Sequence, residues 1–386
     1  MSEIKVNSIK GVGASAAAIT VNNTDGTCTA NISSVNGGQL SSRRLNINGG
    51  MTVAQRGTVT GITSSTYAGP DRFRFGIGSH GTFTVSQDSS APTGSGFANS
   101  LKLACTTADT SVATGAAGYF QHKIEGQDCQ RIKKGTSSAE QLAVQFWVKS
   151  NKTGTYALQC QDNDNSRNFT TTYSISSADT WEKKTITIPA DTTGALDDDN
   201  NVSLTFNFWL VAGTDYTSGS ASSSWYGNTA TNMAKGHTVN IADSTSNTWY
   251  MTGFQVETGS VHTDFEHRSF GQELALCQRY FQKYSAGGDC HMLAARGEGS
   301  SSCVVGVPLC VPLRAQPTVT CGSHRWYRSS SVALTTSTNT PSVLTNDPDI
   351  FSPVICIAAG GHTSTNNEAG VWTPHDDNNL TFSAEL

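Results

Sequence analysis

The feature that most constrains this chain is the alternation of apolar and polar residues along it. Residues 141–149, QLAVQFWVK, carry large apolar side chains at every second position, and residues 202–210, VSLTFNFWL, do the same. A period of two puts alternate side chains on opposite faces of an extended strand. In the first segment these positions are Leu142, Val144, Phe146 and Val148. Such segments recur through residues 43–268 between turn-rich stretches such as DNDNSRN, which predicts a two-sheet antiparallel β-sandwich.

Composition supports a β-rich chain of several parts. Only 14% of its 386 residues are charged, whereas a typical soluble domain has about 25%. The chain contains 37 glycines, and Ser, Thr and Asn fill the gaps between apolar runs. Long solvated helices need more Glu, Lys, Arg and Ala than this. At roughly 100–200 residues per domain, the length predicts two or three units.

The apolar pattern divides the chain into four segments. Residues 1–42 offer short strands, including a hairpin with a turn at Asp25-Gly26, but too little apolar mass for a core. We therefore expect them to form an arm that needs a partner. Residues 43–268 form the sandwich, residues 269–285 a linking helix, and residues 286–386 a second, smaller β domain.

The linking helix is predicted from the segment FGQELALCQRYFQKYS, residues 270–285. Its large apolar residues are spaced by three, four and seven positions, as on one face of a helix. They are Leu274, Cys277, Tyr280, Phe281 and Tyr284. Ser269 and Gln272 fit a capping box at the start, and Gly287-Gly288 fits a helix end. Two packing arrangements are open: around a three-fold axis between chains, or against the same chain's sheet.

Charge and cysteine usage exclude some partners and compartments. The net charge is −5 and the largest basic clusters are pairs of residues, so we expect no nucleic-acid partner. Neither a signal peptide nor a membrane span is expected from the sequence. The ten cysteines form no CxxC pair, which predicts free, buried thiols in a reducing cytosol.

Several stretches together resemble the tail-fibre and related receptor-binding proteins of tailed bacteriophages, particularly those infecting marine bacteria. The most specific stretch is FEHRSFGQELALCQRYFQK at 265–283. The others are the opening SEIKVNSI, RRLNINGGMTVAQRG at 43–57, DRFRF at 71–75, WEKKTITIPADTTG at 181–194, FWLVAGTDYTSG at 208–219 and WYMTGFQVETGS at 249–260. The resemblance covers most of residues 1–284, and beyond them only VPLRAQPTVT at 311–320.

The resemblance implies a virion component that is assembled in the host cytoplasm. Such proteins are homotrimers attached to other tail proteins through the N-terminal arm. They carry a jelly-roll domain similar to carbohydrate-binding modules, and a distal domain meets the host surface. The implied partner is a surface glycan or an outer-membrane receptor. We expect no cofactor and no enzymatic activity; the alternatives are a tailspike-like glycan depolymerase and a purely structural tail appendage or adaptor.

Two segments combine exposed aromatic residues with polar neighbours, as a sugar site requires. The first is the loop at residues 222–228, with Trp225, Tyr226 and Asn228; the alternative is that Trp225 folds back to cap the sandwich. The second is His324, Arg325, Trp326, Tyr327 and Arg328, which would suit an anionic glycan. Its alternative is that Trp326 belongs to the core. The strand patterns assign Trp147, Trp181, Trp209 and Trp249 to core packing.

Acidic residues could in principle bind calcium or perform catalysis. Residues 162–165 and 197–200 supply oxygen ligands, but they lack the Gly and the distal Glu of an EF-hand loop, so a solvated turn is favoured and no metal is assigned. The candidate catalytic carboxylates are Asp71, Glu125, Glu182, Glu257, Glu266 and Glu273. The sequence places no two of them in one cleft. For Glu266 we expect an ion pair with Arg268 that joins the sandwich to the helix.

Overall fold

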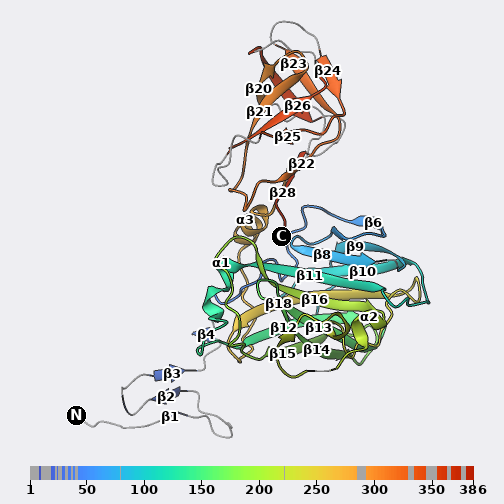
Figure 1. The fold of residues 1–386 in the computed structure, drawn as a ribbon, viewed down its shortest axis with the longest axis vertical. Coiled ribbons are helices and arrows are strands. Elements are labelled where there is room, and N and C mark those ends of the chain that lie inside the picture. The colour runs from blue at the N-terminus through green and yellow to red at the C-terminus, as the bar shows by residue number, and fades with distance from the viewer. Residues whose placement is uncertain are drawn as a thin grey trace.

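The protein is mainly β, with three parts along one long axis (Figure 1). The N-terminal arm lies at one end, the sandwich in the middle, and the C-terminal β domain at the other end, with helix α3 at the junction. The computed structural model describes residues 8–9, 19–21, 24, 28–30, 34–35, 38–39, 42–78, 80–220, 222–284, 293–328, 334–344, 354–362, 367–374 and 380–386. No helix in these ranges is long and apolar enough to cross a bilayer.

Two antiparallel sheets form the sandwich, as the alternation predicted. The six-stranded sheet has the order β15 (Glu182–Ile188), β12 (Leu142–Ser150), β18 (Thr248–Thr258), β10 (Ser100–Thr107), β9 (Thr82–Asp88) and β6 (Val59–Ile62). The seven-stranded sheet has the order β17 (Tyr226–Gly227), β14 (Arg167–Ile175), β13 (Gly154–Asp162), β16 (Val202–Ala212), β11 (Ala117–Glu125), β8 (Phe73–Gly78) and β7 (Thr66–Tyr67). The chain crosses between the sheets at each step from β10 to β13, giving a jelly-roll-like sandwich.

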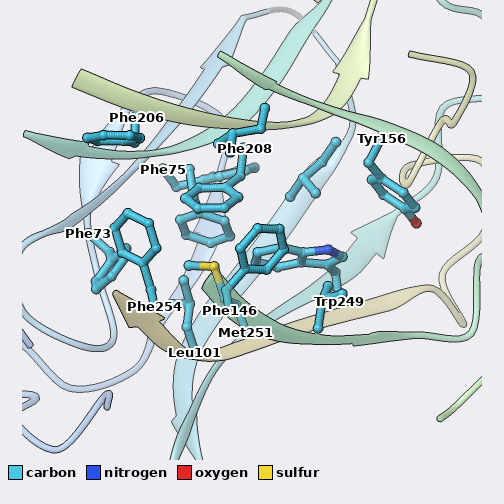
Figure 2. Packing of buried hydrophobic residues seen from close by; sticks show 14 of the residues in the cluster. Phe73, Phe75, Leu101, Phe146, Tyr156, Phe206, Phe208, Trp249, Met251 and Phe254 are labelled. Atoms are coloured by element: carbon cyan, nitrogen blue, oxygen red, sulfur yellow. The ribbon is translucent and has the colours of Figure 1, made fainter. Parts of the chain in front are cut away.

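The core fills the space between these sheets with aromatic side chains (Figure 2). Phe208 of β16 meets Phe254 of β18 edge to face, with ring centroids 5.2 Å apart. Trp249 stacks on Phe120 at 5.6 Å. Aromatic pairs in these geometries stabilise the core beyond the area that they bury. The predicted inward positions of β12 are all buried, and so are Trp209 and Trp249, which confirms their core assignment.

Short helical turns connect the strands of the sandwich. They are α1 (Gly126–Cys129), η1 (Gln130–Ile132), α2 (Thr214–Thr217) and η2 (Ala230–Asn232). In the arm, β1 (Ser8–Ile9), β2 (Ile19–Val21) and β3 (Cys28–Ala30) pair antiparallel, which confirms the predicted hairpin strands; its Asp25-Gly26 turn lies outside the described residues. A separate ladder joins β4 (Ser34–Val35) and β5 (Gly38–Gln39).

The C-terminal domain has a seven-stranded sheet and a smaller sheet that leads back to the sandwich. The larger order is β24 (Leu334–Ser337), β23 (His324–Arg328), β27 (Ala369–Pro374), β20 (Leu293–Glu298), β21 (Ser302–Pro308), β26 (Val354–Gly360) and β25 (Ser342–Val343). The smaller order is β19 (Phe281–Tyr284), β28 (Leu380–Ser383) and β22 (Thr318–Thr320). A buried apolar cluster around Trp326 and Trp372 gives this domain a core of its own.

The linking helix α3 (Phe270–Gln278) is shorter than predicted. Its start is correct, because Ser269 and Gln272 form the reciprocal capping box. The expected end at residue 285 is wrong: the helix stops at Gln278, and residues 281–284 pair with β28 as strand β19. Aromatic residues at 280, 281 and 284 suit a strand, and pairing with a distant strand decided the outcome. A helical spacing of apolar residues could not reveal that partner.

The apolar residues of this segment pack within their own chain. Cys277 and Tyr280 are buried in one cluster with Ile47 and Val53 of the sandwich's first segment. Phe281 lies under the guanidinium of Arg56, which is 3.7 Å from the ring centroid. These positions correspond to the same-chain alternative, since a buried side chain is not free to line an axis between chains.

Buried ion pairs fix the last residues of the chain to the sandwich. The carboxylate of Glu385 pairs with Arg72 and, at 3.1 Å, with Arg56. The Arg72 guanidinium in turn lies 3.3 Å from the centre of the Tyr280 ring. Arg314 donates to the carbonyl of Asn200 at 2.6 Å. The sandwich and the C-terminal domain therefore share a polar, closely packed junction.

The eight cysteines whose side chains the structure describes are free, as expected. Six are buried, and burial raises the pKa of Cys303 and Cys321 to about 12. The structure places Cys310 on the surface and Cys356 at an intermediate position. Most of these thiols therefore behave as small apolar side chains.

Candidate functional site

The predicted site in the C-terminal domain is largely buried. Strand β23 lies between β24 and β27, where Trp326 pairs with Trp372. Both Trp326 and His324 have no exposed surface, so the Trp326 ring belongs to the core, as the alternative proposed. Arg325 and Tyr327 are half-buried on the opposite face of β23, and the side chain of Arg328 lies outside the described set. The structure does not bring the five residues together on one surface.

His324 has a structural hydrogen-bonding role. Its Nε2 lies 2.7 Å from the carbonyl oxygen of Asn339, to which it donates as the protonated nitrogen of the neutral ring. Its Nδ1 then accepts from the indole N–H of Trp372 at 3.1 Å and lies 2.8 Å from Nε2 of His362. Burial lowers the pKa of His324. A neutral ring is required here, because a proton on Nδ1 would face the Trp372 N–H.

The predicted site in the loop at 222–228 also turns inward. Trp225 is half-buried, and its indole N–H donates to the carbonyl of Pro189 at 2.8 Å. The Tyr226 hydroxyl is 2.6 Å from the Thr170 hydroxyl, while Asn228 is exposed and accepts from Asn168 at 3.0 Å. Trp225 caps the sandwich, in agreement with the alternative prediction for this loop. The hydrogen bonds of Tyr226 and Asn228 hold the same loop in place.

The open face of the six-stranded sheet carries aromatic residues that the sequence analysis assigned to the core. Since Phe146 and Val148 of β12 point inward, Trp147 and Lys149 point to the other face. Tyr250 of β18 lies directly opposite Lys149. Trp147 and Trp181 are half-buried, as Trp225 is, but unlike Trp225 they do not pack against the hydrophobic core cluster, so their assignment to the core is wrong. The alternation along β12 correctly indicates that Trp147 points away from the core. The assignment to the core followed the large size of the tryptophan ring instead.

Three of these side chains form a connected cluster across the sheet. The Trp181 and Tyr250 rings have centroids 6.2 Å apart at an interplanar angle of 65°. The ammonium of Lys149 lies between them, 4.2 Å from the Tyr250 centroid and 5.3 Å from that of Trp181. A cation above a ring face is attracted by the electron density of the ring. The cluster therefore fixes the Tyr250 ring and one positive charge in place.

A cavity of about 240 Å³ lies beside this cluster, with Trp147 on its wall. Phe97 and Phe265 supply further aromatic surface, and Gln145 and Lys183 supply polar groups. Glycine at position 253 lets the rings of Phe97 and Trp147 lie close to the backbone of β18, because a Cβ there would lie 2.7 Å from the Phe97 ring and 3.1 Å from Trp147. Its φ of +63° also suits glycine, at a register shift between β12 and β18.

A larger cavity of about 870 Å³ lies where the sandwich, α3 and the C-terminal domain meet. Leu276 and Val311 contribute apolar surface, and Arg131, Arg268 and Asp128 contribute charge. Many of the polar groups that line this cavity already form hydrogen bonds within the protein. Arg131, for example, donates to the carbonyl of Ser42, and Arg268 donates to that of Arg44 at 2.8 Å.

Carboxylates at this junction are engaged in structural contacts. Glu266 accepts the backbone N–H groups of residues 42, 43 and 44 at 2.7–2.8 Å. Burial alone would raise the pKa of Glu266, but these three donors lower it. Arg268 does not form the expected direct ion pair with Glu266, although its charge helps to lower the pKa of Glu266. Arg268 instead lies 3.6 Å from Glu273 of the helix, which also pairs with Arg44. Glu266 still joins the sandwich to the helix segment, through the backbone.

The remaining carboxylates are similarly occupied. Glu125 forms two bonds with Arg279, at 3.1 and 2.9 Å. Asp71 accepts from the Gln55 backbone, and burial raises the pKa of Asp71 although Arg56 opposes this. Glu257 accepts from Thr263 at 2.9 Å, and Glu182 accepts from Ser176 at 2.8 Å and from Lys184. These contacts orient the acids for structure.

The acidic turns at residues 162–165 and 197–200 are also held by protein groups. Asp162 is fully buried and accepts from the ammonium of Lys134 at 2.6 Å. Asn165 donates to the same carboxylate at 3.0 Å, and the backbone N–H of Asp197 donates to Asp164. Within the described ranges, no three His, Cys, Asp or Glu side chains gather as a metal site would require.

Comparisons with known proteins found distant structural likenesses. No family model and no curated protein matches the chain. It is similar to the enzymatically active domain of tailspike protein 4 of bacteriophage CBA120, at 13% identity and a TM-score of 0.28, over 48% of this chain and 19% of that chain. It is also similar to the family 11 carbohydrate-binding module of a Clostridium thermocellum cellulosomal cellulase, at 11% identity and a TM-score of 0.27, over 53% and 98% of the chains. A third similar structure is TmCBM61 in complex with β-1,4-galactotriose, at 10% identity and a TM-score of 0.29, over 56% and 99%.

Proposed function

We propose that this protein is a phage tail fibre that binds a glycan on the host cell through the open face of its six-stranded sheet. The observation that supports this is the set of half-buried aromatic residues Trp147 of β12, Tyr250 of β18 and Trp181, which directly precedes β15, all outside the core cluster. Two of these rings lie 6.2 Å apart. Large aromatic surfaces that stay accessible on a rigid sheet are typical of ligand sites.

The chemistry of this face suits sugars. The apolar side of a pyranose ring packs on a flat aromatic face, while its hydroxyls need nearby donors and acceptors. Here Lys149, Lys102 and Asp88 supply such groups beside Tyr250. Because the side chains come from paired strands, binding requires little ordering of loops, which would otherwise cost conformational entropy.

Alanine variants of the aromatic residues test the binding site. We expect Trp147→Ala, Trp181→Ala and Tyr250→Ala each to weaken binding to host cells about tenfold, or about 1.4 kcal/mol. Phe270→Ala is the matched control, since its ring is 61% exposed at the start of α3 but away from the sheet. Unchanged binding of all three variants, with folding confirmed by circular dichroism, would contradict this site.

The virion role rests on the sequence resemblance over residues 1–284, and the arm at residues 1–42 would contact the tail. We expect a homotrimer in solution by light scattering, and antibody labelling of virions at the distal end of a fibre. A stable monomer at micromolar concentration, or a label confined to an internal position, would contradict the fibre role. The internal position would favour the structural adaptor.

We further propose that the protein binds its glycan without cleaving it. The support is that the six candidate carboxylates contact arginines, lysines, hydroxyls or backbone groups of their own chain. Incubation with host-surface polysaccharide should release no reducing sugar above a blank. Release that is abolished by Glu266→Gln or Glu273→Gln would instead indicate a depolymerase.

A further inference from the structure

We infer that the ligand of the open sheet face is an acidic glycan, one whose sugar units carry carboxylate or sulfate groups. This inference rests on the proposed glycan-binding function and adds the charge of the ligand. It follows from three lysines, Lys102, Lys149 and Lys183, which surround the aromatic residues of this face.

Each lysine is adjacent to an aromatic residue across the strands. Lys149 and Lys102 both lie opposite Tyr250, one on each neighbouring strand, with ammonium groups 4.2 and 5.4 Å from its ring centroid. Lys183 lies opposite Trp147, lines the cavity beside it, and is exposed. An anionic substituent on a sugar stacked against these rings would therefore meet an ammonium group.

Positive charge exceeds negative charge at this cluster. Lys102 pairs with Asp88 at 3.0 Å. In the part of the chain that the structure describes, no carboxylate lies within 4 Å of the ammonium of Lys149 or Lys183. The Lys149 ammonium instead donates to the hydroxyl of Ser90 at 2.7 Å, a neutral partner. Asp264 lines the same cavity as Lys183, and the charge of Asp88 interacts with Lys149 as well as with Lys102. Three ammonium groups therefore face two carboxylates, which leaves an excess of one positive charge for a ligand.

This local excess stands out because the whole chain has a net charge of −5. A neutral glycan would gain little from three ammonium groups, which must lose part of their hydration when a ligand covers them. An acidic glycan compensates for that loss with charge-assisted hydrogen bonds. A nucleic acid is disfavoured, since its dense phosphates would be repelled by the rest of the chain.

Binding measurements with polymers of defined charge test the inference. The probes are polygalacturonate for carboxylate, dextran sulfate for sulfate, and dextran as the neutral polymer. We expect the wild-type protein to bind at least one acidic polymer about tenfold more tightly than dextran. Raising NaCl from about 50 to about 500 mM should weaken this binding at least about fivefold, because salt screens exposed charges. The two acidic probes show which group is preferred.

Charge variants assign the effect to this face. Lys149→Gln and Lys183→Gln should each weaken acidic-polymer binding about fivefold. Lys183→Gln should leave the melting temperature unchanged, whereas Lys149→Gln, which also loses the contacts with Tyr250 and Trp181, should lower it by at most about 3 °C. Lys133→Gln is the control, since Lys133 is exposed and pairs with Glu140 elsewhere on the sandwich. Binding should stay unchanged in this control.

Three outcomes would overturn the inference, and they separate it from the proposed function. Equal binding of dextran and the acidic polymers, lost in Trp147→Ala but retained in the lysine variants, would leave a glycan site for a neutral ligand. Binding of single-stranded oligothymidylate as tight as that of the acidic polymers would indicate a general polyanion surface. No binding of any polymer, together with unchanged host-cell binding by the aromatic variants, would end both proposals.

Discussion

Strands β12 and β23 each carry a tryptophan and a basic residue, yet the two tryptophans lie on opposite sides of their sheets. In β12, Trp147 reaches the open face because Phe146 and Val148 occupy the core side. In β23, Trp326 fills the core, and Arg325 and Tyr327 point the other way. Similar composition therefore gives a candidate ligand surface in one domain and a core in the other. The difference is whether the tryptophan belongs to the alternate residues of the strand that face the core or to those that face the other side of the sheet.

The largest expected effect comes from removing the two tryptophans separately. Trp326→Ala leaves a cavity in the C-terminal core and should lower the free energy of unfolding by about 3–5 kcal/mol. Trp147→Ala removes a half-buried ring that lies outside the core and should cost about 1 kcal/mol while weakening ligand binding. Urea unfolding followed by fluorescence measures both. Equal losses for the two variants would contradict the comparison.

The junction determines whether the two domains behave as one unit. Glu385→Gln leaves Arg72 buried without its ionised partner and should cost about 3 kcal/mol. We expect calorimetry to show two separate transitions in this variant. Glu298→Gln is the control, because its pair with Arg296 is exposed and 3.9 Å long, and its loss should stay within about 0.5 kcal/mol. A single transition in Glu385→Gln would show that other contacts suffice.

Gly253 tests how the open face of the sandwich keeps its shape. Gly253→Ala places a methyl group against Phe97 and Trp147 at a positive φ, which should cost about 1–2 kcal/mol. The displaced rings should also narrow the cavity and shift tryptophan fluorescence. Gly227→Ala is the control in the same fold, since a Cβ there meets nothing within 4 Å. Equal stability of the two variants would contradict the close approach at Gly253.

The smallest effect concerns pH and distinguishes the two cores. Burial lowers the pKa of His324 in the C-terminal domain and, in the sandwich, lowers the pKa of His237 to about 4. The unfolded chain takes up protons near pH 6.5, whereas the folded chain resists them. Stability from each group is therefore complete above about pH 6.5 and falls as pH drops, for His237 until about pH 4, by at most about 1.4 kcal/mol per pH unit.

Histidine substitutions assign this pH dependence to a domain. In the Glu385→Gln background, where we expect the two domains to unfold separately, His324→Asn should flatten the pH dependence of the free energy of unfolding between about pH 6.5 and pH 5.5 in the C-terminal transition and leave that of the sandwich unchanged. His237→Asn should have the converse effect. Denaturant unfolding at several pH values measures these slopes. An unchanged slope in both variants would show that other groups control the response.

Much of the fold could be predicted, and less of the site. The alternation in β12 and β16 gave their inward faces correctly, because strand periodicity is local. The capping box at Ser269 was equally readable, since it involves neighbours in sequence. The end of α3 was not, because residues 281–284 pair with β28, about a hundred positions away. The aromatic residues of the candidate sites were chosen from their neighbours in sequence, whereas the burial of each ring depends on the residues that pack over it in the fold.

The sequence by itself determined that this chain builds antiparallel sheets with apolar inner faces and one capped helix. Only the tertiary structure decided which aromatic rings pack against a core and which lie outside it. Trp225 turned inward because Pro189 offers a carbonyl to its indole N–H, and Trp326 because it packs beside Trp372. Trp147 and Tyr250 stayed on the open face beside Lys149. The physical reason is that the alternation within a strand sets the side of the sheet on which a side chain lies. The residues that pack over that side come from distant parts of the sequence.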